Sequence, residues 1–173
     1  MPHLIVAYPK IASTDYSWVQ NVRREHDRQY HIVEPHFTIV FPTIDIEEAP
    51  FIAHAQSQSS NFPAFNFISR CAVIEKDAFN DLTHVFLVPD EGYSNIVKLH
   101  DRLYRGILLP QLRLDISFIP HIGIGNYIDP SQSKNLADEL NIQNFELVGR
   151  IDTLDIIKIE NSQVETIHQI PLS

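Results

Sequence analysis

The fold class that this sequence predicts is α+β, with mainly antiparallel strands. Short segments rich in β-branched and aromatic residues alternate along the chain with longer segments of helical pattern. Turn-forming residues join neighbouring strand segments into hairpins, and hairpins imply antiparallel pairing. The chain has 173 residues, 44% of them hydrophobic, so it can bury a substantial core.

In the first half of the chain we expect a strand, a helix, a second strand, a second helix and a hairpin. The first helix begins with the capping residues Ser13, Thr14 and Asp15. The second strand holds Pro35 and ends at Pro42, and a turn-forming segment joins the hairpin strands. The expected ranges are, in order, 4–8, 13–28, 32–41, 47–58, and the hairpin strands 65–75 and 83–89.

The second half continues with a helix, a strand, a helix and a second hairpin. Its first helix has apolar side chains at helical spacing with charged residues between them, which indicates an amphipathic helix packed on a core. Pro110 ends that helix, and Pro130 suits the first turn of the next one. The expected ranges are 93–108, 114–124, 130–140, 145–159 and 163–170.

The two halves are predicted to form one two-lobed domain that spans residues 1–173. Each half is built from both strands and helices, and no linker rich in Gly or Ser separates them. Only 5 glycines occur in the whole chain. We therefore expect two lobes that share one body around a single cleft, and a monomer.

The charge balance argues against an extended nucleic-acid surface. Acidic side chains number 22 and basic ones 13, which leaves a formal charge of -9 and an unfavourable background for a long polyanion. The lone Cys71 cannot form an internal disulfide, and its apolar surroundings predict a buried, inert thiol. No run of about 18 apolar residues exists, so we expect no membrane span. The N-terminus lacks a basic leader, and a cytoplasmic location is the default expectation.

Two similar motifs carry the chemistry. Residues 35–39 and 120–124 both read proline, histidine, apolar residue, small residue, isoleucine, and they lie about half the chain apart on expected strands. Because alternate side chains of a strand share a face, His36 and Thr38 point one way and their apolar neighbours point the other. This pattern is typical of a strand that lines a cleft.

A pair of histidines suits the cleavage or formation of a phosphodiester. That reaction needs one group to take a proton from the attacking oxygen and another to deliver one to the leaving oxygen. Histidine can do both, because its ordinary pKa of about 6.5 lets either protonation state be populated near neutrality. The hydroxyl of Thr38 can donate a hydrogen bond to a phosphate oxygen. This scheme requires no metal and no other cofactor.

The paired motifs, their spacing and the order of elements resemble the two-histidine phosphoesterase superfamily, which includes 2′-5′ RNA ligase-like proteins and cyclic phosphodiesterases. The resemblance implies a bilobal, pseudo-symmetric fold in which two mainly antiparallel sheets flanked by helices enclose a central cleft. It also implies that His36 and His121 are the catalytic residues. Thr38 matches the phosphate-binding hydroxyl of the first motif.

The second motif departs from the family pattern. Gly123 occupies the position of the second hydroxyl, which removes one donor to the phosphate. Glycine can instead let the backbone approach a phosphate closely, so Gly123 remains a candidate phosphate-binding position. The basic residue that often follows the second motif in RNA ligase-like members is also absent, since Asn126 and Tyr127 follow Gly125.

Other patterns in the sequence are less specific. The remaining histidines show no spacing typical of metal ligands, and Glu25, His26 and Asp27 are expected to form a solvated helix face. Asp115, Ser117 and His121 lack the nucleophile elbow of a hydrolase triad, and 123–125 is too short for a dinucleotide fingerprint. The candidates for nucleobase stacking are Tyr8, Phe41 and Tyr127, and the candidate phosphate partners are Lys10, Arg70 and Arg150.

The sequence therefore predicts a metal-independent phosphoesterase. Its expected substrates are 2′,3′-cyclic or 2′-5′-linked phosphodiesters of nucleotides or RNA ends. The alternative is a non-catalytic module that binds a nucleotide or phosphorylated ligand in the same cleft, which Gly123 motivates. A protein–protein adaptor is a third reading, but it leaves the duplicated motif unexplained.

Overall fold

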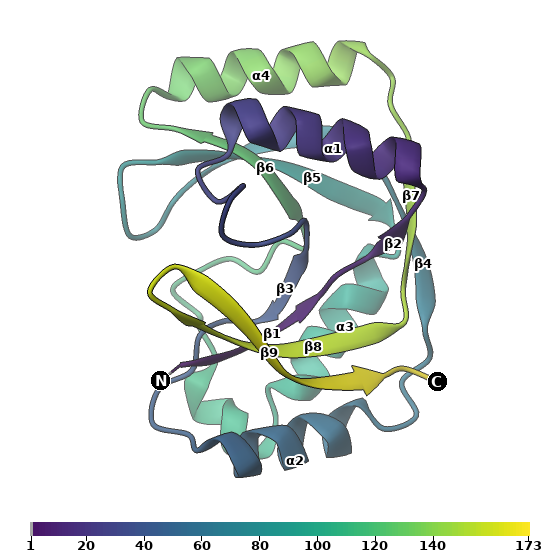
Figure 1. Cartoon of the computed structure of the whole chain (residues 1–173), viewed down its shortest axis with the longest axis vertical. Coiled ribbons are helices and arrows are strands. Elements are labelled where there is room, and N and C mark those ends of the chain that lie inside the picture. Colours follow the sequence, from purple (N-terminus) through teal and green to yellow (C-terminus); the bar gives the residue numbers. More distant parts are fainter. Residues whose placement is uncertain (1) are drawn as a thin grey trace.

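A computed structural model describes residues 2–173 of the chain (Figure 1). Within those residues the chain forms nine strands, four α-helices and one 3₁₀ helix. The strands are β1 (His3–Ala7), β2 (Lys10–Ile11), β3 (Phe37–Val40), β4 (Phe65–Lys76), β5 (Thr83–Glu91), β6 (Ile122–Tyr127), β7 (Leu147–Ile151), β8 (Thr153–Glu160) and β9 (Gln163–Pro171). The helices are α1 (Ser13–His26), α2 (Glu48–Ser59), α3 (Tyr93–Leu103), η1 (Gly106–Gln111) and α4 (Pro130–Ile142).

The strands form one curled sheet with the order β2-β7-β4-β5-β6-β3-β1-β8-β9. Every pairing in it is antiparallel, so the expected α+β class is confirmed. The two sheets that we expected are two parts of this single sheet. They join where β3 meets β6, and the only paired residues there are Phe37 and Ile122.

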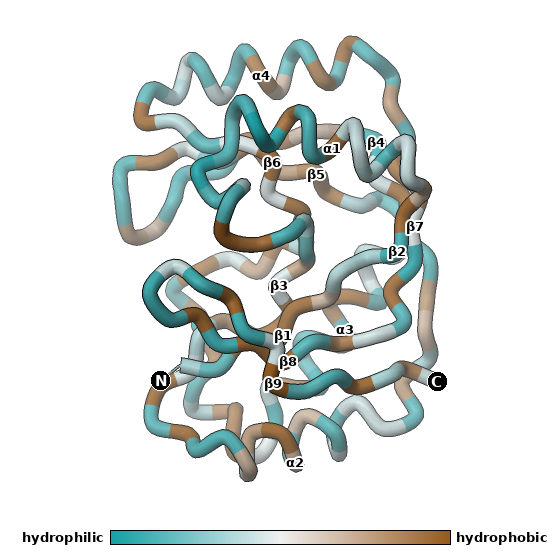
Figure 2. Tube along the Cα trace, in the orientation of Figure 1, coloured by the Kyte–Doolittle hydropathy of each residue, from teal (hydrophilic) through white to brown (hydrophobic). Residues whose placement is uncertain are grey.

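Two groups of helices cover the two ends of the sheet (Figure 1). Helices α1 and α4 pack on β4, β5 and β6, whereas α2 packs on α3 and α3 packs on β3 and β5. In Figure 2, apolar and polar residues alternate along α4, whose buried Leu136, Ala137 and Leu140 follow helical spacing. Helix α4 thus buries one apolar stripe, and α3 buries another that includes Ile96, Leu99 and Leu103.

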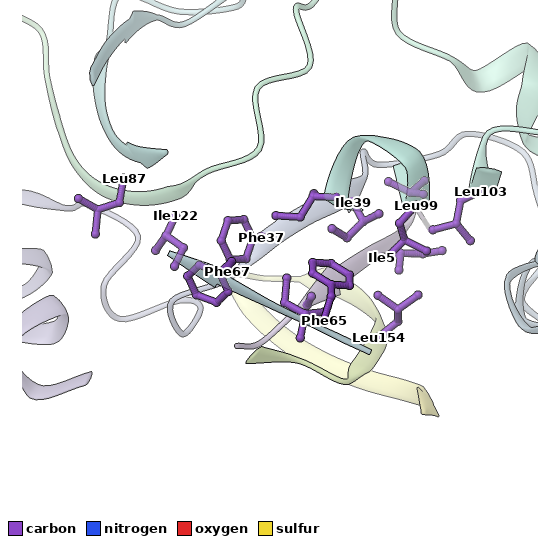
Figure 3. Packing of buried hydrophobic residues seen from close by; sticks show 14 of the residues in the cluster. Ile5, Phe37, Ile39, Phe65, Phe67, Leu87, Leu99, Leu103, Ile122 and Leu154 are labelled. Carbon is purple, nitrogen blue, oxygen red and sulfur yellow. The ribbon is translucent and has the colours of Figure 1, made fainter. Parts of the chain in front are cut away.

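The core runs through the junction between the two parts of the sheet. Phe37 of β3, Phe67 of β4 and Ile122 of β6 are fully buried and lie close together in Figure 3. The rings of Phe37 and Phe67 meet edge to face, with centroids 5.0 Å apart. Burying side chains of this size stabilises the fold by roughly 1.5–3 kcal/mol each. The core therefore holds the junction in place.

Some boundaries differ from those expected. The helix expected over 93–108 ends at Leu103 and is followed by η1, which begins at Gly106 with a positive φ of 51°. Glycine accepts that conformation without steric cost, so it is a natural break. The strand expected over 145–159 divides at Asp152 into β7 and β8, which belong to opposite ends of the sheet.

The segments before the two motif strands are irregular, although we expected strand from residues 32 and 114. Strand β3 begins only at Phe37 and β6 only at Ile122. Pro35 and Pro120 lack a backbone N–H, so neither can donate to a strand ladder. As a result, each motif histidine is the last residue before its strand.

Two side chains lie in environments opposite to those expected. Cys71 is exposed, because the register of β4 shifts between Ser69 and Cys71 and this bulge changes which side chains face inward. Asp27 is buried instead of lying on a solvated face, because it pairs with the buried Arg23. Among residues 2–173, no helix combines the length and apolar character needed to cross a membrane.

Candidate functional site

The pairing of Phe37 with Ile122 brings the two motifs together. Both side chains are fully buried, so the residues next to them on each strand point to the other side of the sheet. On that side lies a pocket with a volume of about 480 Å³. All four residues expected at the site line this pocket, namely His36, Thr38, His121 and Gly123.

The two imidazoles are held by equivalent hydrogen bonds. His36 Nδ1 lies 2.8 Å from the carbonyl oxygen of Glu34, and His121 Nδ1 lies 2.5 Å from that of Ile119. Each carbonyl belongs to the residue two positions earlier. Because a carbonyl oxygen only accepts, each Nδ1 carries the proton. The opposite nitrogen, Nε2, is therefore the proton acceptor in each neutral ring.

Burial sets the protonation state of both rings. Desolvation lowers the pKa of His36 below its ordinary value and lowers the pKa of His121 to about 4. The backbone hydrogen bond to Ile119 opposes that shift, whereas the nearby imidazoles of His36 and His84 add to it. At neutral pH both motif histidines are therefore uncharged in the free protein.

Aromatic rings fix the planes of the two imidazoles. The ring of His121 stacks on Phe86 with centroids 3.5 Å apart and planes 16° apart. His84, two residues before Phe86 on β5, also lies parallel to that ring with centroids 5.3 Å apart. Tyr8 meets His36 edge-on, with centroids 6.2 Å apart. Such contacts restrict rotation of a side chain that must aim one nitrogen at a ligand.

A buried ion pair supports the wall of the pocket. Arg23 Nε donates to Asp27 Oδ2 at 2.8 Å, and the two side chains are only 2% and 5% exposed. Arg23 also donates to the carbonyl oxygen of Val33, in the segment that leads to His36. Asn126 of β6 donates to Asp27 Oδ1 at 3.0 Å. The network thus connects the segment just before His36 to β6, the strand that follows His121.

The basic residues named as candidate phosphate partners lie elsewhere. The lining of the pocket includes none of Lys10, Arg70 and Arg150. Arg70 is bound by three carboxylates, and Lys10 donates to another carboxylate at 2.6 Å. Arg113 does line the pocket, and Asp115 accepts hydrogen bonds from two of its nitrogens. The sequence did not single out Arg113 as a pocket residue. Its neighbours in space are set by the course of a loop, which local sequence patterns do not predict.

Only one of the three candidates for nucleobase stacking lines the pocket. Phe41 lines the pocket, whereas Tyr8 and Tyr127 do not. Tyr127 is instead hydrogen-bonded to His26.

The hydrolase triad is not formed, because the carboxylate oxygens of Asp115 are both bonded to Arg113.

No cluster in residues 2–173 has three or more His, Cys, Asp or Glu side chains placed to hold a metal ion. The buried His100 hydrogen-bonds to the carbonyl oxygen of Ile39, and His54 to that of Leu103. His84 bonds to Asp77 Oδ2 at 2.7 Å. These histidines are each held by an oxygen acceptor of the protein.

Sequence reasoning missed several residues that shape the pocket. They are Arg23, Asp27, His84, Phe86, Phe118 and Asn126. The spacing of Arg23 and Asp27, four residues apart on a helix, was a signal for an ion pair but not for its burial. His84 and Phe86 alternate on β5, which places them on one face, but nothing local showed that this face meets His121.

Comparisons with known proteins identify the family of the chain. A family model described as the 2′-5′ RNA ligase superfamily matches residues 8–163. A protein from Geobacillus sp. (strain WCH70) with the name "Putative phosphoesterase" is 22% identical over 162 residues, which cover 93% of this chain and 90% of that protein. Such a match over nearly the full length of both chains extends well beyond the two motifs.

Solved structures share the fold. E. coli LigT in complex with 3′-AMP aligns with a TM-score of 0.57 and 10% identity, covering 100% of this chain and 99% of that chain. Usb1 of Kluyveromyces marxianus with uridine monophosphate aligns with a TM-score of 0.54 and 12% identity, covering 99% of this chain and 98% of that chain. The family model spans most of the sequence, and the folds agree over their full length. The chain therefore belongs to the 2′-5′ RNA ligase superfamily, a family of phosphoesterase-type enzymes.

Proposed function

We propose that this protein cleaves 2′,3′-cyclic or 2′-5′-linked phosphodiesters of nucleotides or RNA ends, with His36 and His121 as an acid/base pair. The observation that carries the proposal is the equivalent setting of the two imidazoles. Each has its Nδ1 proton bound to a backbone carbonyl oxygen and lines the same pocket. LigT and Usb1 bind nucleoside monophosphates in their solved complexes, which supports a nucleotide substrate.

From the two histidines the reaction needs two proton transfers, one from water to a ring and one from a ring to the substrate. For a cyclic phosphate, Nε2 of one histidine takes a proton from water as the water oxygen bonds to phosphorus. The protonated Nε2 of the other delivers a proton to the ribose oxygen as its bond to phosphorus breaks. Thr38 donates a hydrogen bond to a non-bridging oxygen and stabilises the charge that develops there. Proton exchange with solvent then resets the pair.

The environments of the two rings suggest which one is the acid. His121 has the pKa of about 4 and stays neutral, which suits the base. The pKa of His36 is lowered chiefly by burial, and the charge of a protonated His36 ring in turn lowers the pKa of His121, which places protonation of His36 first. We therefore assign the acid role to His36. A bound phosphate anion adds further negative charge and favours the protonated form.

The test is the turnover of 2′,3′-cyclic mononucleotides and 2′-5′-linked dinucleotides by His36→Gln and His121→Gln. Each substitution removes a proton-transfer group and should lower kcat by about 10²–10⁴. His168→Gln, on β9 and outside the pocket, is the matched control and should retain full activity. Thermal unfolding of all variants separates lost chemistry from lost folding. Full activity in both pocket variants would refute the assignment.

A second candidate function is a binding module without turnover, which the open space at Gly123 favours. Apart from Gly123 and its two chain neighbours, no residue has an atom within 4 Å of the position that a Cβ on Gly123 would take, so no other side chain replaces the missing hydroxyl there. The module would bind nucleotides in the same pocket. Tight nucleotide binding by a wild-type protein that turns over none of the panel would favour this function over catalysis.

A further inference from the structure

The pocket contains a third histidine, which the proposed reaction does not use. His84 lies near the start of β5 and lines the pocket together with His36 and His121. Its Nε2 lies 2.7 Å from Asp77 Oδ2, and the two side chains are only 20% and 17% exposed. A largely buried ionisable pair beside the motif histidines is a candidate for a functional role.

Asp77 holds His84 from an ordered turn between β4 and β5. The backbone N–H of Asp77 donates to the carbonyl oxygen of Leu82 at 2.9 Å and closes the turn. Asp77 Oδ1 accepts from the backbone N–H groups of Phe79 at 2.7 Å and Asn80 at 3.1 Å. The other carboxylate oxygen, Oδ2, is directed to His84. The carboxylate thus has a fixed position, and so does the imidazole that is bonded to it.

The bond between Asp77 and His84 is charge-assisted. Burial alone would raise the pKa of Asp77, but the hydrogen bonds from His84 and from two backbone N–H groups outweigh burial and lower that pKa. The carboxylate is therefore ionised at neutral pH and only accepts, so Nε2 of His84 carries the proton. Hydrogen bonds to an ionised carboxylate are shorter and stronger than those between neutral groups. Rotation of the His84 ring is restricted as a result.

Three near-parallel rings lead from His84 to His121. The planes of His84 and Phe86 differ by 13°, with centroids 5.3 Å apart. Those of Phe86 and His121 differ by 16°, with centroids 3.5 Å apart. Phe86 pairs with Gly123, two residues after His121, so the stack crosses from β5 to β6. Because packed rings leave little free space, the anchored ring of His84 limits how far the rings of Phe86 and His121 can tilt.

The other charged side chains of the pocket lining largely balance one another. They are Arg23, Asp27, Glu75, Lys76, Arg113 and Asp115. Arg23 pairs with Asp27. Arg113 pairs with Asp115, and its guanidinium carbon lies 4.9 Å from the ring centroid of Phe79. Glu75 lies across from His84 in the ladder of β4 and β5. The bond to Asp77 is therefore the contact that fixes His84.

The third histidine also acts on the protonation of His121. Burial is the main cause of the low pKa of His121, about 4, and the imidazoles of His36 and His84 lower that pKa further. A base must be neutral before it takes a proton. His84 thus supports the role of His121 both by contact and electrostatically.

We propose that His84, fixed by Asp77, is a positioning residue that holds the ring of His121 through Phe86. The inference rests on the proposed function, because it concerns how one of the two proton-transfer groups is oriented. The bond from Nδ1 to Ile119 holds one edge of the His121 imidazole, and the stack holds its face. Misplacement of such a group by about 1 Å can cost about 100-fold in rate.

The first test is the kinetics of His84→Gln and Asp77→Asn on 2′,3′-cyclic mononucleotides. The first variant removes the ring, and the second removes the carboxylate but keeps an oxygen for the N–H groups of the turn. Each should lower kcat by about 10-fold or more with little change in KM, because neither side chain is assigned a contact with the substrate. Asp81→Asn is the matched control, since Asp81 lies in the same turn but is 96% exposed. Its kcat should equal that of the wild type.

Proton NMR at neutral pH gives a second readout, which needs no turnover. Protons of a ring that lies face to face on a phenyl ring are shifted upfield, so the ring signals of His121 report its stack on Phe86. In His84→Gln that shift should shrink, and the pKa of His121 should rise above about 4. His168→Gln, on β9 and outside the pocket, is the control and should leave both unchanged.

The positioning role is overturned by wild-type kcat in His84→Gln, or by an unchanged ring shift and pKa of His121 in that variant. Equal falls in kcat for Asp77→Asn and Asp81→Asn would overturn it too. Thermal unfolding shows whether each variant is folded, and Asp77→Asn carries the test if His84→Gln does not fold. If the wild type cleaves none of the substrates, the proposed function fails, and the ring shift of His121 still decides the positioning role.

Discussion

Phe37 and Ile122 face each other across the junction of β3 and β6, and the residue before each of them is a motif histidine. In an antiparallel ladder this register sets His36 across from Gly123 and His121 across from Thr38. The same contact joins the two parts of the sheet and anchors the core. Formation of the pocket and closure of the sheet are therefore one structural event.

The pH dependence of catalysis should be displaced to acid. Activity needs a neutral base and a protonated acid, so kcat/KM falls below the lower pKa and above the higher one. For His121 the lower limit is a pKa of about 4, and burial places the pKa of His36 below its ordinary value. We expect a bell-shaped kcat/KM profile with its maximum on the acid side of pH 6.5. A maximum above pH 7 would contradict the assigned pair.

Gly123→Thr should fold normally and act faster on phosphodiesters. The space for a Cβ is open, and the new hydroxyl would lie on the same face of the sheet as Thr38. If it donates to the phosphate, kcat/KM should rise by about 10-fold or more, since one lost donor of this kind typically costs 10²–10³. Steady-state kinetics measure the change.

Gly125→Ala is the matched comparison for that variant. Its Cβ would lie 2.8 Å from Leu136 Cδ2 and 3.2 Å from His26 Cβ, so crowding should lower the melting temperature without raising the rate. A Gly123→Thr protein that folds but gains no activity would mean that the missing hydroxyl does not limit the reaction.

Asp27→Asn should destabilise the protein strongly. The change leaves the guanidinium of Arg23 buried without a counter-charge, which typically costs about 3–5 kcal/mol. Asp138→Asn breaks a pair with the same helical spacing, that with Lys134, but both of its side chains are more than half exposed. That control should cost at most about 1 kcal/mol. Urea unfolding measures the free energy of unfolding of both variants. Equal losses in that free energy would show that burial does not make the Arg23–Asp27 pair more stabilising than the exposed pair.

The stability of the fold should fall as the pH is lowered towards 4. The unfolded chain binds a proton at His121 below about pH 6.5, whereas the native chain does so only near its pKa of about 4. Stability from this group is thus complete above pH 6.5 and is lost between pH 6.5 and 4, by about 3 kcal/mol. In His121→Gln that share of the loss should disappear, whereas in His31→Gln, at an exposed position, it should remain. Chemical denaturation at several pH values provides the measurement.

Sequence patterns of short range predicted most of the elements. Runs of β-branched residues located the strands, and Pro130 located the start of α4, whereas the N-cap of α1 is Ala12 and has no side-chain cap. The Pro-His repeats also identified the four residues that line one end of the pocket. The errors lie where backbone geometry depends on residues far away in the chain. At Cys71, a bulge in the pairing of β4 with β5 decides which face of the sheet the side chain occupies.

By itself, the sequence determined the α+β class, the antiparallel pairing and the two histidine motifs, because these follow from the periodicity and identity of neighbouring residues. Only the tertiary structure decided that the two sheets join at Phe37 and Ile122, that Asp27 is buried with Arg23, and that Phe79 meets Arg113. The junction and the meeting of Phe79 with Arg113 link residues far apart in the chain. The burial of the helical pair depends on what packs against α1. Local spacing carries no information about such contacts, which are set by how the whole sheet curls and packs.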